Sequence, residues 1–316
     1  MAPLPLVLGF GLPAVAGLFA AGHAASWGAF KDSPFEGFRW ASYARTLVLG
    51  VVIAVAVSLW LPLTGPASAV VLIGVTYALE RLGTEWWKSI VRNDDQAAYT
   101  IPMRLGFLGR TVESRSVRYA VGAAVAGVVV LGLVGLHLAQ TALGGLPAAL
   151  GLLATWGVGS LGGWATAVGG AWKDAPVEGF SPWKFLRSPA VAIAWAIPLS
   201  ALTASWPALV VAAAGLAVVS IETYKTFFTR GRPPGKFAGK PARPVGRLLR
   251  RAMALQNAAW WLAFGALLGL SASVLVVVAP EAIMMATLAV GSAFISLAVV
   301  RQGLLQAQPV SPTGAA

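Results

Sequence analysis

The chain has 316 residues, of which 58% are hydrophobic and only 11% charged, and its 23 Lys and Arg against 11 Asp and Glu give a net charge of +12. This composition excludes an ordinary soluble protein, and the recurring long apolar stretches predict an all-α polytopic membrane protein. Because the chain contains no cysteine, disulfides, a thiolate nucleophile and cysteine-ligated metals are excluded.

We predict about nine membrane spans, separated by turn signals such as LPLTGP and by polar loops. The run from Thr46 to Leu79 contains no charge in 34 residues. A single helix of that length would be about 51 Å long, so we interpret the run as a hairpin of two spans. The predicted spans are 4–26, 43–62, 66–87, 119–139, 146–170, 188–204, 207–228, 255–279 and 282–301.

One charged phrase occurs twice in the chain. FKDSPFEGFRWASYAR at 30–45 and WKDAPVEGFSPWKFLR at 172–187 are 142 residues apart, and seven of fifteen positions from Lys31 to Arg45 are identical. We interpret this as a tandem duplication of a four-helix unit. An even number of spans per unit gives both units the same orientation in the membrane. The predicted divisions are a first repeat (1–140), a second repeat (141–279), an additional span (280–305) and a disordered tail (306–316).

Basic residues divide the predicted loops into two groups. Lys and Arg border the first, third, fifth and seventh loops and follow the last span, whereas the even loops and the N-terminus have none. The positive-inside rule predicts that the odd loops and the C-terminus are cytoplasmic and the N-terminus is outside, in the inner cell membrane. The net positive charge then faces membrane lipids, and no separate basic domain is present to bind nucleic acid.

The repeated phrase supplies the candidate catalytic residues. Its two carboxylates are four residues apart, and if the proline between them starts a turn, both can point at one spot. Two such pairs would hold Mg²⁺ against a substrate phosphate. The same phrase also fits a tight loop whose carboxylates are neutralised by Lys or Arg. The candidate catalytic residues are Asp32, Glu36, Asp174 and Glu178, with Asp32 and Asp174 as candidate metal ligands.

Basic and acidic residues around the phrases are candidates for substrate binding. EWWKSIVR at 85–92 resembles ETYKTFFTR at 222–230, so Glu222 matches Glu85 in this alignment but Glu80 at the offset of 142. Both pairings remain open. Glu followed by Lys three residues later is also an ordinary helix-surface pair. The candidates are Lys31, Arg45, Glu80, Glu85, Lys88, Lys173, Arg187, Glu222 and Lys225.

Two further features carry weaker expectations. His23 and His137 lie in or beside apolar segments, and we expect packed, hydrogen-bonded residues rather than metal ligands. The segment GKFAGK at 235–240 resembles a phosphate-cradling loop, but it lacks the usual spacing and no strand precedes it. We expect the long basic loops to set topology and to contact anionic lipid.

These features favour a transferase that acts on a lipid or polyprenyl phosphate at the cytoplasmic leaflet, because paired carboxylates stand beside basic residues on that side. The parallel duplication also fits a transporter or flippase of a lipid-like cargo. Spans rich in Gly and Ala suit a non-catalytic scaffold subunit as well, since they allow close helix packing. Either active role implies a phosphate-bearing lipid as the ligand.

Overall fold

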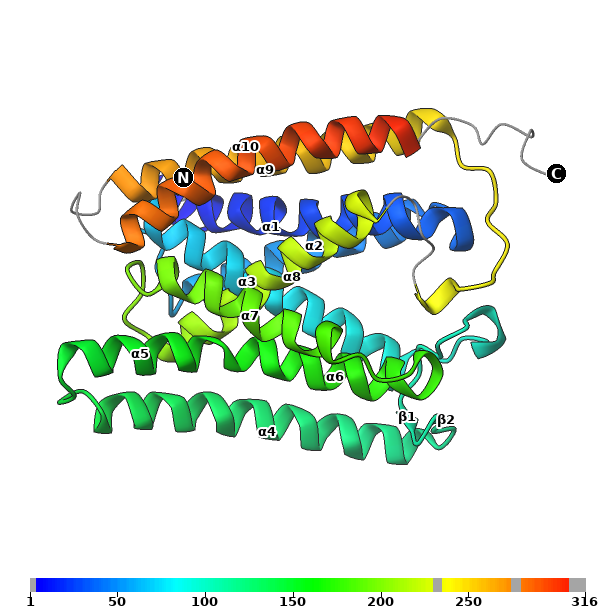
Figure 1. Ribbon diagram of the computed structural model, residues 1–316, viewed down its shortest axis with the longest axis horizontal. Helices are drawn as coiled ribbons and strands as arrows, with labels where there is room; N and C mark the ends of the chain where they lie inside the picture. Colours follow the sequence, from blue (N-terminus) through cyan, green and yellow to red (C-terminus); the bar gives the residue numbers. More distant parts are fainter. Residues whose placement is uncertain (1–3, 230–234, 274–279, 307–316) are drawn as a thin grey trace.

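The computed structural model describes residues 4–229, 235–273 and 280–306, and most of these residues are helical (Figure 1). Residues 307–316 of the predicted tail and residues 274–279 of the eighth predicted span lie outside the described residues. The helices are α1 (Leu4–Glu36), α2 (Trp40–Ser58), α3 (Pro66–Trp86), α4 (Arg115–Ala142), α5 (Ala148–Gly159), α6 (Leu161–Glu178), α7 (Pro182–Leu199), α8 (Trp206–Thr223), α9 (Arg247–Ser273) and α10 (Pro280–Gln306).

The short elements gather at one end of the bundle, toward the right in Figure 1, where α1, α3, α6 and α8 also end. We call this the loop end. The short elements are the π-helical turns Trp87–Val91 and Tyr224–Phe228, the 3₁₀ turns Gln96–Ala98 and Gly235–Phe237, and the antiparallel strands β1 (Gly106–Phe107) and β2 (Arg110–Thr111).

Six helical segments are long and apolar enough to cross a membrane, which agrees with the predicted class of helical membrane protein. They are Trp40–Ser58, Pro66–Val91, Arg115–Ala142, Trp206–Phe228, Arg247–Ser273 and Ile283–Gln306. A helix overlaps each of the nine predicted spans, but the number of crossings stays a prediction. The fifth predicted span is divided at Ser160 between α5 and α6. Glycines on both sides of Ser160 weaken the helix there.

The core lies along the seam between α3 and α8. About 67% of the α8 span is buried inside the protein, compared with 6% of the α4 span. Glycine allows the two central helices to approach closely: a Cβ on Gly74 would lie 2.9 Å from the carbonyl oxygen of Ala212, and one on Gly215 would collide with the backbone at Gly74. Close packing of this kind holds helices together where water provides no driving force.

Small residues also join α1 to α2 and α5 to α7. A Cβ on Gly17 would lie 2.8 Å from the Cβ of Ala54. One on Gly159 would collide with the Cβ of Ala196. Both members of the second contact lie 142 residues after their counterparts in the first, which is the offset of the repeated charged phrase.

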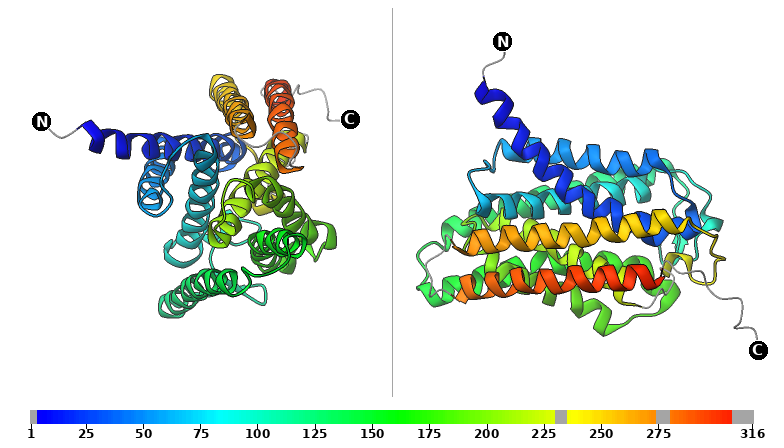
Figure 2. Two further views of the ribbon diagram at one scale, coloured as in Figure 1. Left: turned by 90° about the vertical axis from the view of Figure 1, so that its left-hand side faces the viewer. Right: turned by 90° about the horizontal axis from the view of Figure 1, so that it is seen from above.

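The outer helices surround this core unequally. The hairpin of α9 and α10 packs against α1 and α3, with further contacts from α10 to α7. Helix α4 packs mainly against α8 and the π-helical turn after α3, and most of its side chains are exposed. The first turns of α1 project away from the bundle (Figure 2). The surfaces of α4 and of the start of α1 are therefore available to lipid.

Candidate functional site

A cavity of about 1200 Å³ opens at the loop end, between the last turns of α1, α3, α6 and α8 and the first turns of α2 and α7. Thirteen Lys or Arg residues and seven Asp or Glu residues line it, a surplus of six positive charges. We call it the basic cavity. A concave surface lined by charges of mainly one sign attracts ligands of the opposite sign, so the surplus favours an anionic ligand.

Twelve of the thirteen predicted site residues line the basic cavity: Lys31, Asp32, Glu36, Arg45, Glu85, Lys88, Lys173, Asp174, Glu178, Arg187, Glu222 and Lys225. Glu80 is the exception. It is buried, its Oε1 accepts a hydrogen bond from Thr84 at 2.8 Å, and its Oε2 has no hydrogen-bond partner among the described residues. Residues from distant parts of the chain thus share one site.

The repeated phrase is helical through its second carboxylate, which corrects the prediction of a turn at its proline. It forms the last turns of α1 and α6. Gly37 and Gly179 follow these helices with φ of +76° and +80°, and each donates its N–H to the carbonyl four residues earlier at 2.9 Å. Glycine adopts this left-handed conformation without strain, so both helices end there. Asp32 and Glu36 therefore share a helix face.

Lys236 binds both carboxylates of the first phrase. Its Nζ lies 2.8 Å from Asp32 and 3.5 Å from Glu36. Burial lowers the pKa of Lys236, but the two carboxylates outweigh burial and raise this pKa above its ordinary value. The neighbouring Phe237 is buried and stacks on Phe35 with ring centroids 4.6 Å apart. The GKFAGK segment therefore fastens the loop after α8 to the end of α1.

The carboxylates of the second phrase have different surroundings. Glu178 pairs with Lys184 at 2.6 Å. Asp174 is half-buried, and no ion pair among the described residues involves it. Burial raises the pKa of Asp174, although the nearby Lys173 acts in the opposite direction. Asp174 is therefore a cavity carboxylate that could take up a proton or a cation.

The four carboxylates do not converge as a ready-made ligand set. Within residues 4–229, 235–273 and 280–306, no group of three or more His, Asp or Glu side chains lies together so that it could hold a metal ion. Mg²⁺ commonly takes only one or two protein carboxylates and completes its coordination with water and substrate phosphate. A Mg²⁺ ion in the basic cavity would have to bind in that manner.

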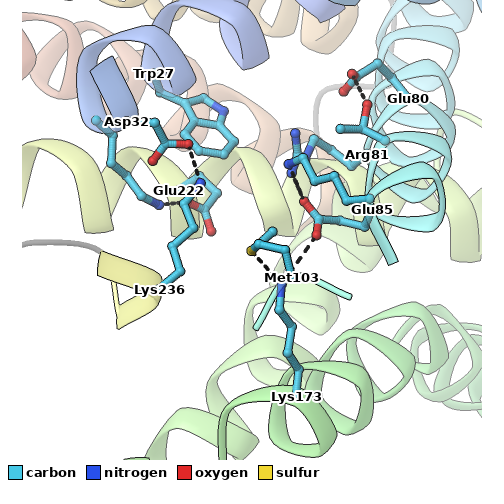
Figure 3. A network of polar contacts seen from close by, with 12 residues as sticks. Trp27, Asp32, Glu80, Arg81, Glu85, Met103, Lys173, Glu222 and Lys236 are labelled. Atoms are coloured by element: carbon cyan, nitrogen blue, oxygen red, sulfur yellow. Dashed lines mark hydrogen bonds and ion pairs between the residues drawn. The ribbon is translucent and has the colours of Figure 1, made fainter. Parts of the chain in front are cut away.

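Two ion pairs cross the cavity reciprocally. Lys31 of α1 binds Glu222 of α8 at 2.7 Å, and Lys173 of α6 lies 3.7 Å from Glu85 of α3. The two lysines are equivalent positions of the repeated phrase. Figure 3 shows Glu85 between Arg81 and Lys173, with Glu222 on the opposite side near Asp32. Each phrase thus contacts a glutamate from the other half of the chain.

Glu85, not Glu80, occupies the place in α3 that Glu222 has in α8. Each of these two glutamates is the last residue but one of its helix, and a π-helical turn follows. Lys88 and Lys225, three residues later, bind the respective glutamates at 2.9 and 3.0 Å. The local geometry therefore supports the alignment of EWWK with ETYK.

Two important residues of the site were missed from the sequence. Arg81 binds Glu85 at 2.7 Å and lines the cavity. Its spacing of four residues before Glu85 on a helix was a usable signal. Lys236 is 204 residues from Asp32, and only the folded chain shows that they meet.

A buried polar cluster lies next to the cavity wall. His23 is fully buried, with its Nδ1 3.1 Å from the hydroxyl of Tyr77 and its Nε2 2.9 Å from that of Thr223. Trp27, which lines the cavity, donates to the same Tyr77 hydroxyl at 2.8 Å, and Trp261 donates to Thr223 at 3.0 Å. The prediction that His23 is a packed, hydrogen-bonded residue is confirmed.

No known protein family, no curated protein and no solved structure matches this chain. Its function is therefore inferred from the geometry and the charges of the basic cavity.

Proposed function

We propose that this protein is a nine-span transporter of the inner cell membrane that carries a phosphate-bearing lipid, such as a polyprenyl phosphate. The observation that carries the proposal is the basic cavity, whose lining has six more positive than negative charges. An anionic headgroup would be attracted into this cavity, while its hydrocarbon tail stays in the surrounding lipid. Such a cargo requires no charged residue at the middle of the spans.

The proposed orientation rests on the positive-inside rule. The long basic segments after α3 and α8 both lie at the loop end, whereas α1 begins at the opposite end (Figure 1). With the loop end in the cytoplasm and the N-terminus outside, the basic cavity takes its cargo from the cytoplasmic leaflet. Anionic lipids of that leaflet add to the attraction.

We further propose that repeats 1–140 and 141–279 are parallel halves that enclose the cavity. Three observations support the duplication: the repeated phrase, the matched contacts of α1 with α2 and of α5 with α7, and the reciprocal ion pairs. Transporters built from parallel repeats place their binding site between the halves. The two halves then move against each other along the seam of α3 and α8.

The carboxylates of the site favour transport over chemistry. Asp32 and Glu36 are neutralised by Lys236, and Glu178 by Lys184. A carboxylate held in an ion pair is a poor general base, since its charge is already stabilised. Most of the predicted catalytic residues thus act in our proposal as partners of lysines that line the cavity.

Movement of a lipid phosphate across a membrane tests the proposal directly. Purified protein is reconstituted into liposomes with a fluorescent polyprenyl phosphate, and a membrane-impermeant quencher reports how fast the probe changes leaflet. We expect transfer that depends on the protein and that falls in Arg187→Gln, which removes a cavity charge. Arg110→Gln is the matched control, because Arg110 is exposed and does not line the cavity. Folded protein that moves the probe no faster than empty liposomes would overturn the proposal.

A transferase acting on the same lipid phosphate is the second candidate, and Asp174 favours it. This half-buried carboxylate faces the cavity without an ion-pair partner among the described residues, and its raised pKa suits a general base. Alternatively, Asp174 could hold Mg²⁺ together with a substrate phosphate. Asp32 would be its counterpart in the other half.

Titration with Mg²⁺ in the presence of the lipid phosphate tests this second candidate by thermal unfolding. A transferase of this type predicts a stabilisation that Asp174→Asn removes and Asp32→Asn weakens. Asp94→Asn is the control, since Asp94 lines the cavity but pairs with Arg92 at 2.5 Å. The same stabilisation in Asp174→Asn and in the unmodified protein would rule out a metal ligand at this position.

A further inference from the structure

Glu85 is surrounded by more positive charge than it can neutralise. Arg81 and Lys88 approach its Oε1 at 2.7 and 2.9 Å, and Lys173 approaches its Oε2 at 3.7 Å. In the part of the chain that the structure describes, no other carboxylate forms an ion pair with these three side chains. The centre therefore has three cations and one anion.

The equivalent centre at Glu222 is more nearly balanced. Only Lys31 and Lys225 bind Glu222, and its side chain is 14% exposed, compared with 41% for Glu85. The Glu222 pair is thus closed within the protein. The Glu85 centre has an unmatched charge of two and an opening into the cavity through which a ligand can reach it.

Holding two unmatched cations in a recess with little water is costly. The side chains of Arg81 and Lys88 are each 18% exposed, and that of Lys173 is 29% exposed. Charges removed from water are tolerated when counter-charges and hydrogen bonds complete them. A dianion matches the surplus, and a phosphate monoester carries about −1.5 to −2 at pH 7. A phosphate diester carries only a single negative charge.

We propose that Arg81, Lys88 and Lys173 form a phosphate subsite that selects a phosphate monoester over a diester. The inference rests on the proposed function for the lipid nature of the ligand. The shared chemistry is a terminal phosphate, either on a lipid or free in solution.

The three side chains have different tasks in this subsite. The Arg81 guanidinium lies over the Trp27 ring, 5.1 Å from its centroid, and a planar guanidinium held in this way suits two phosphate oxygens. Lys88 is fixed one helical turn from Glu85. Lys173 is the least committed, since it is the farthest from Glu85 and its other partner is the Met103 sulfur at 3.4 Å, a weak acceptor. Lys173 therefore turns to the incoming phosphate.

Binding of a phosphate here would also connect the two halves, because Lys173 lies on α6 while Arg81 and Lys88 lie on and just after α3. The ligand would replace the long contact of Lys173 with Glu85 by a direct phosphate contact. Occupancy of the subsite thus changes how tightly α6 is held against α3.

Binding to the full-length protein in detergent, measured by calorimetry, tests the inference with three probes: a short-chain phosphatidic acid, a short-chain phosphatidylglycerol and inorganic phosphate. At pH 8 we expect the monoester lipid to bind about tenfold more tightly than the diester lipid, the effect of one charge-assisted contact. The preference should shrink at pH 5, where the monoester loses its second charge. Equal affinities for the two lipids at pH 8 would overturn the inference.

Variants localise the selectivity. Lys173→Gln should remove the monoester preference, and Lys173→Arg should retain it, so that loss by misfolding is recognised. Lys184→Gln is the matched control, because Lys184 lines the same cavity, is 60% exposed and pairs with Glu178 instead. Full preference in Lys173→Gln would place selectivity elsewhere and contradict the assignment.

The outcomes separate this inference from the proposed function. Transport of both lipids at equal rates and affinities would contradict the monoester subsite and leave the transporter intact. Selective monoester binding without any transfer would contradict the transporter and leave the subsite intact. Inorganic phosphate that binds as tightly as the monoester lipid would identify free phosphate as the ligand.

Discussion

Lys31 on α1 and Glu222 on α8 are 191 residues apart in the chain, and their ion pair of 2.7 Å joins the two halves of the protein across the basic cavity. Its counterpart, Lys173 with Glu85, is longer at 3.7 Å and more exposed. The same pair of residue types thus forms a closed contact on one side and a loose contact on the other. Ligand access is therefore expected on the looser side.

A double-mutant cycle on Lys31→Gln and Glu222→Gln should show strong coupling. Both side chains are nearly buried, so removal of either partner leaves an uncompensated charge and costs about 3 kcal/mol. The double variant should recover part of this loss. The measurement is thermal unfolding in detergent. Lys184→Gln with Glu178→Gln is the reference cycle, where the exposed lysine predicts coupling below about 1 kcal/mol. Equal coupling in both cycles would contradict the buried pair.

The two histidines should respond differently to substitution. His23→Ala leaves the hydroxyls of Tyr77 and Thr223 without a ring nitrogen in a fully buried place, and we expect a loss of about 3 kcal/mol. His137→Ala should leave the unfolding midpoint unchanged, because His137 is exposed on α4. A loss of stability of the same size in both variants would contradict the role of His23 in the buried cluster.

Asp174→Asn and Asp32→Asn should have opposite effects on stability at pH 7. Because burial raises the pKa of Asp174 in the folded protein, the stabilisation from its neutral form is complete below about 3.8 and is lost as the pH rises through the folded pKa. Asn avoids that loss, so Asp174→Asn should be neutral or stabilising. Asp32→Asn deprives Lys236 of its closest partner and should destabilise. Unfolding midpoints decide, and at pH 4 the benefit of Asp174→Asn should shrink.

Lys236 should make the attachment of its loop sensitive to alkaline pH. Its pKa is raised in the folded protein, so its contribution is fully present below about 10.5 and is lost as the pH rises through the folded pKa. We expect the stability of the unmodified protein to fall more steeply above pH 10.5 than that of Lys236→Gln. Other lysines and tyrosines titrate in both proteins, so the difference between the two curves is the readout. Parallel curves would contradict a stabilising role of this ion pair.

Much of the candidate site could be predicted because its residues lie in a repeated pattern. The phrase around Asp32 and Asp174 stands out in a chain with few charges, and duplication at a constant offset identifies its basic neighbours as well. Lys236 could not be found in this way, since it has no counterpart in the first repeat at that offset and meets Asp32 only through the fold. Glu80 was included because of the offset, whereas the helix ends favour Glu85.

Helix boundaries show a second limit of prediction from the sequence. The first span was predicted to end at residue 26, where the apolar stretch ends, but α1 continues to Glu36. Hydropathy indicates where a helix leaves lipid, whereas the helix itself ends where Gly37 takes a left-handed conformation. The same difference explains why the repeated phrase was expected to be a loop.

The unequal surroundings of α1 and α6 have a mechanical consequence. At the offset of 142, the positions of His23 and Trp27 are taken by Ala165 and Gly169, so the second half lacks the polar cluster that anchors α1. With α9 packed along α1, the first half forms a rigid reference frame. Helix α6 instead follows the break at Ser160, which gives it a pivot. Although the halves descend from one ancestor in our proposal, we expect them to divide the labour, with the first half as the fixed part and α6 as the moving one.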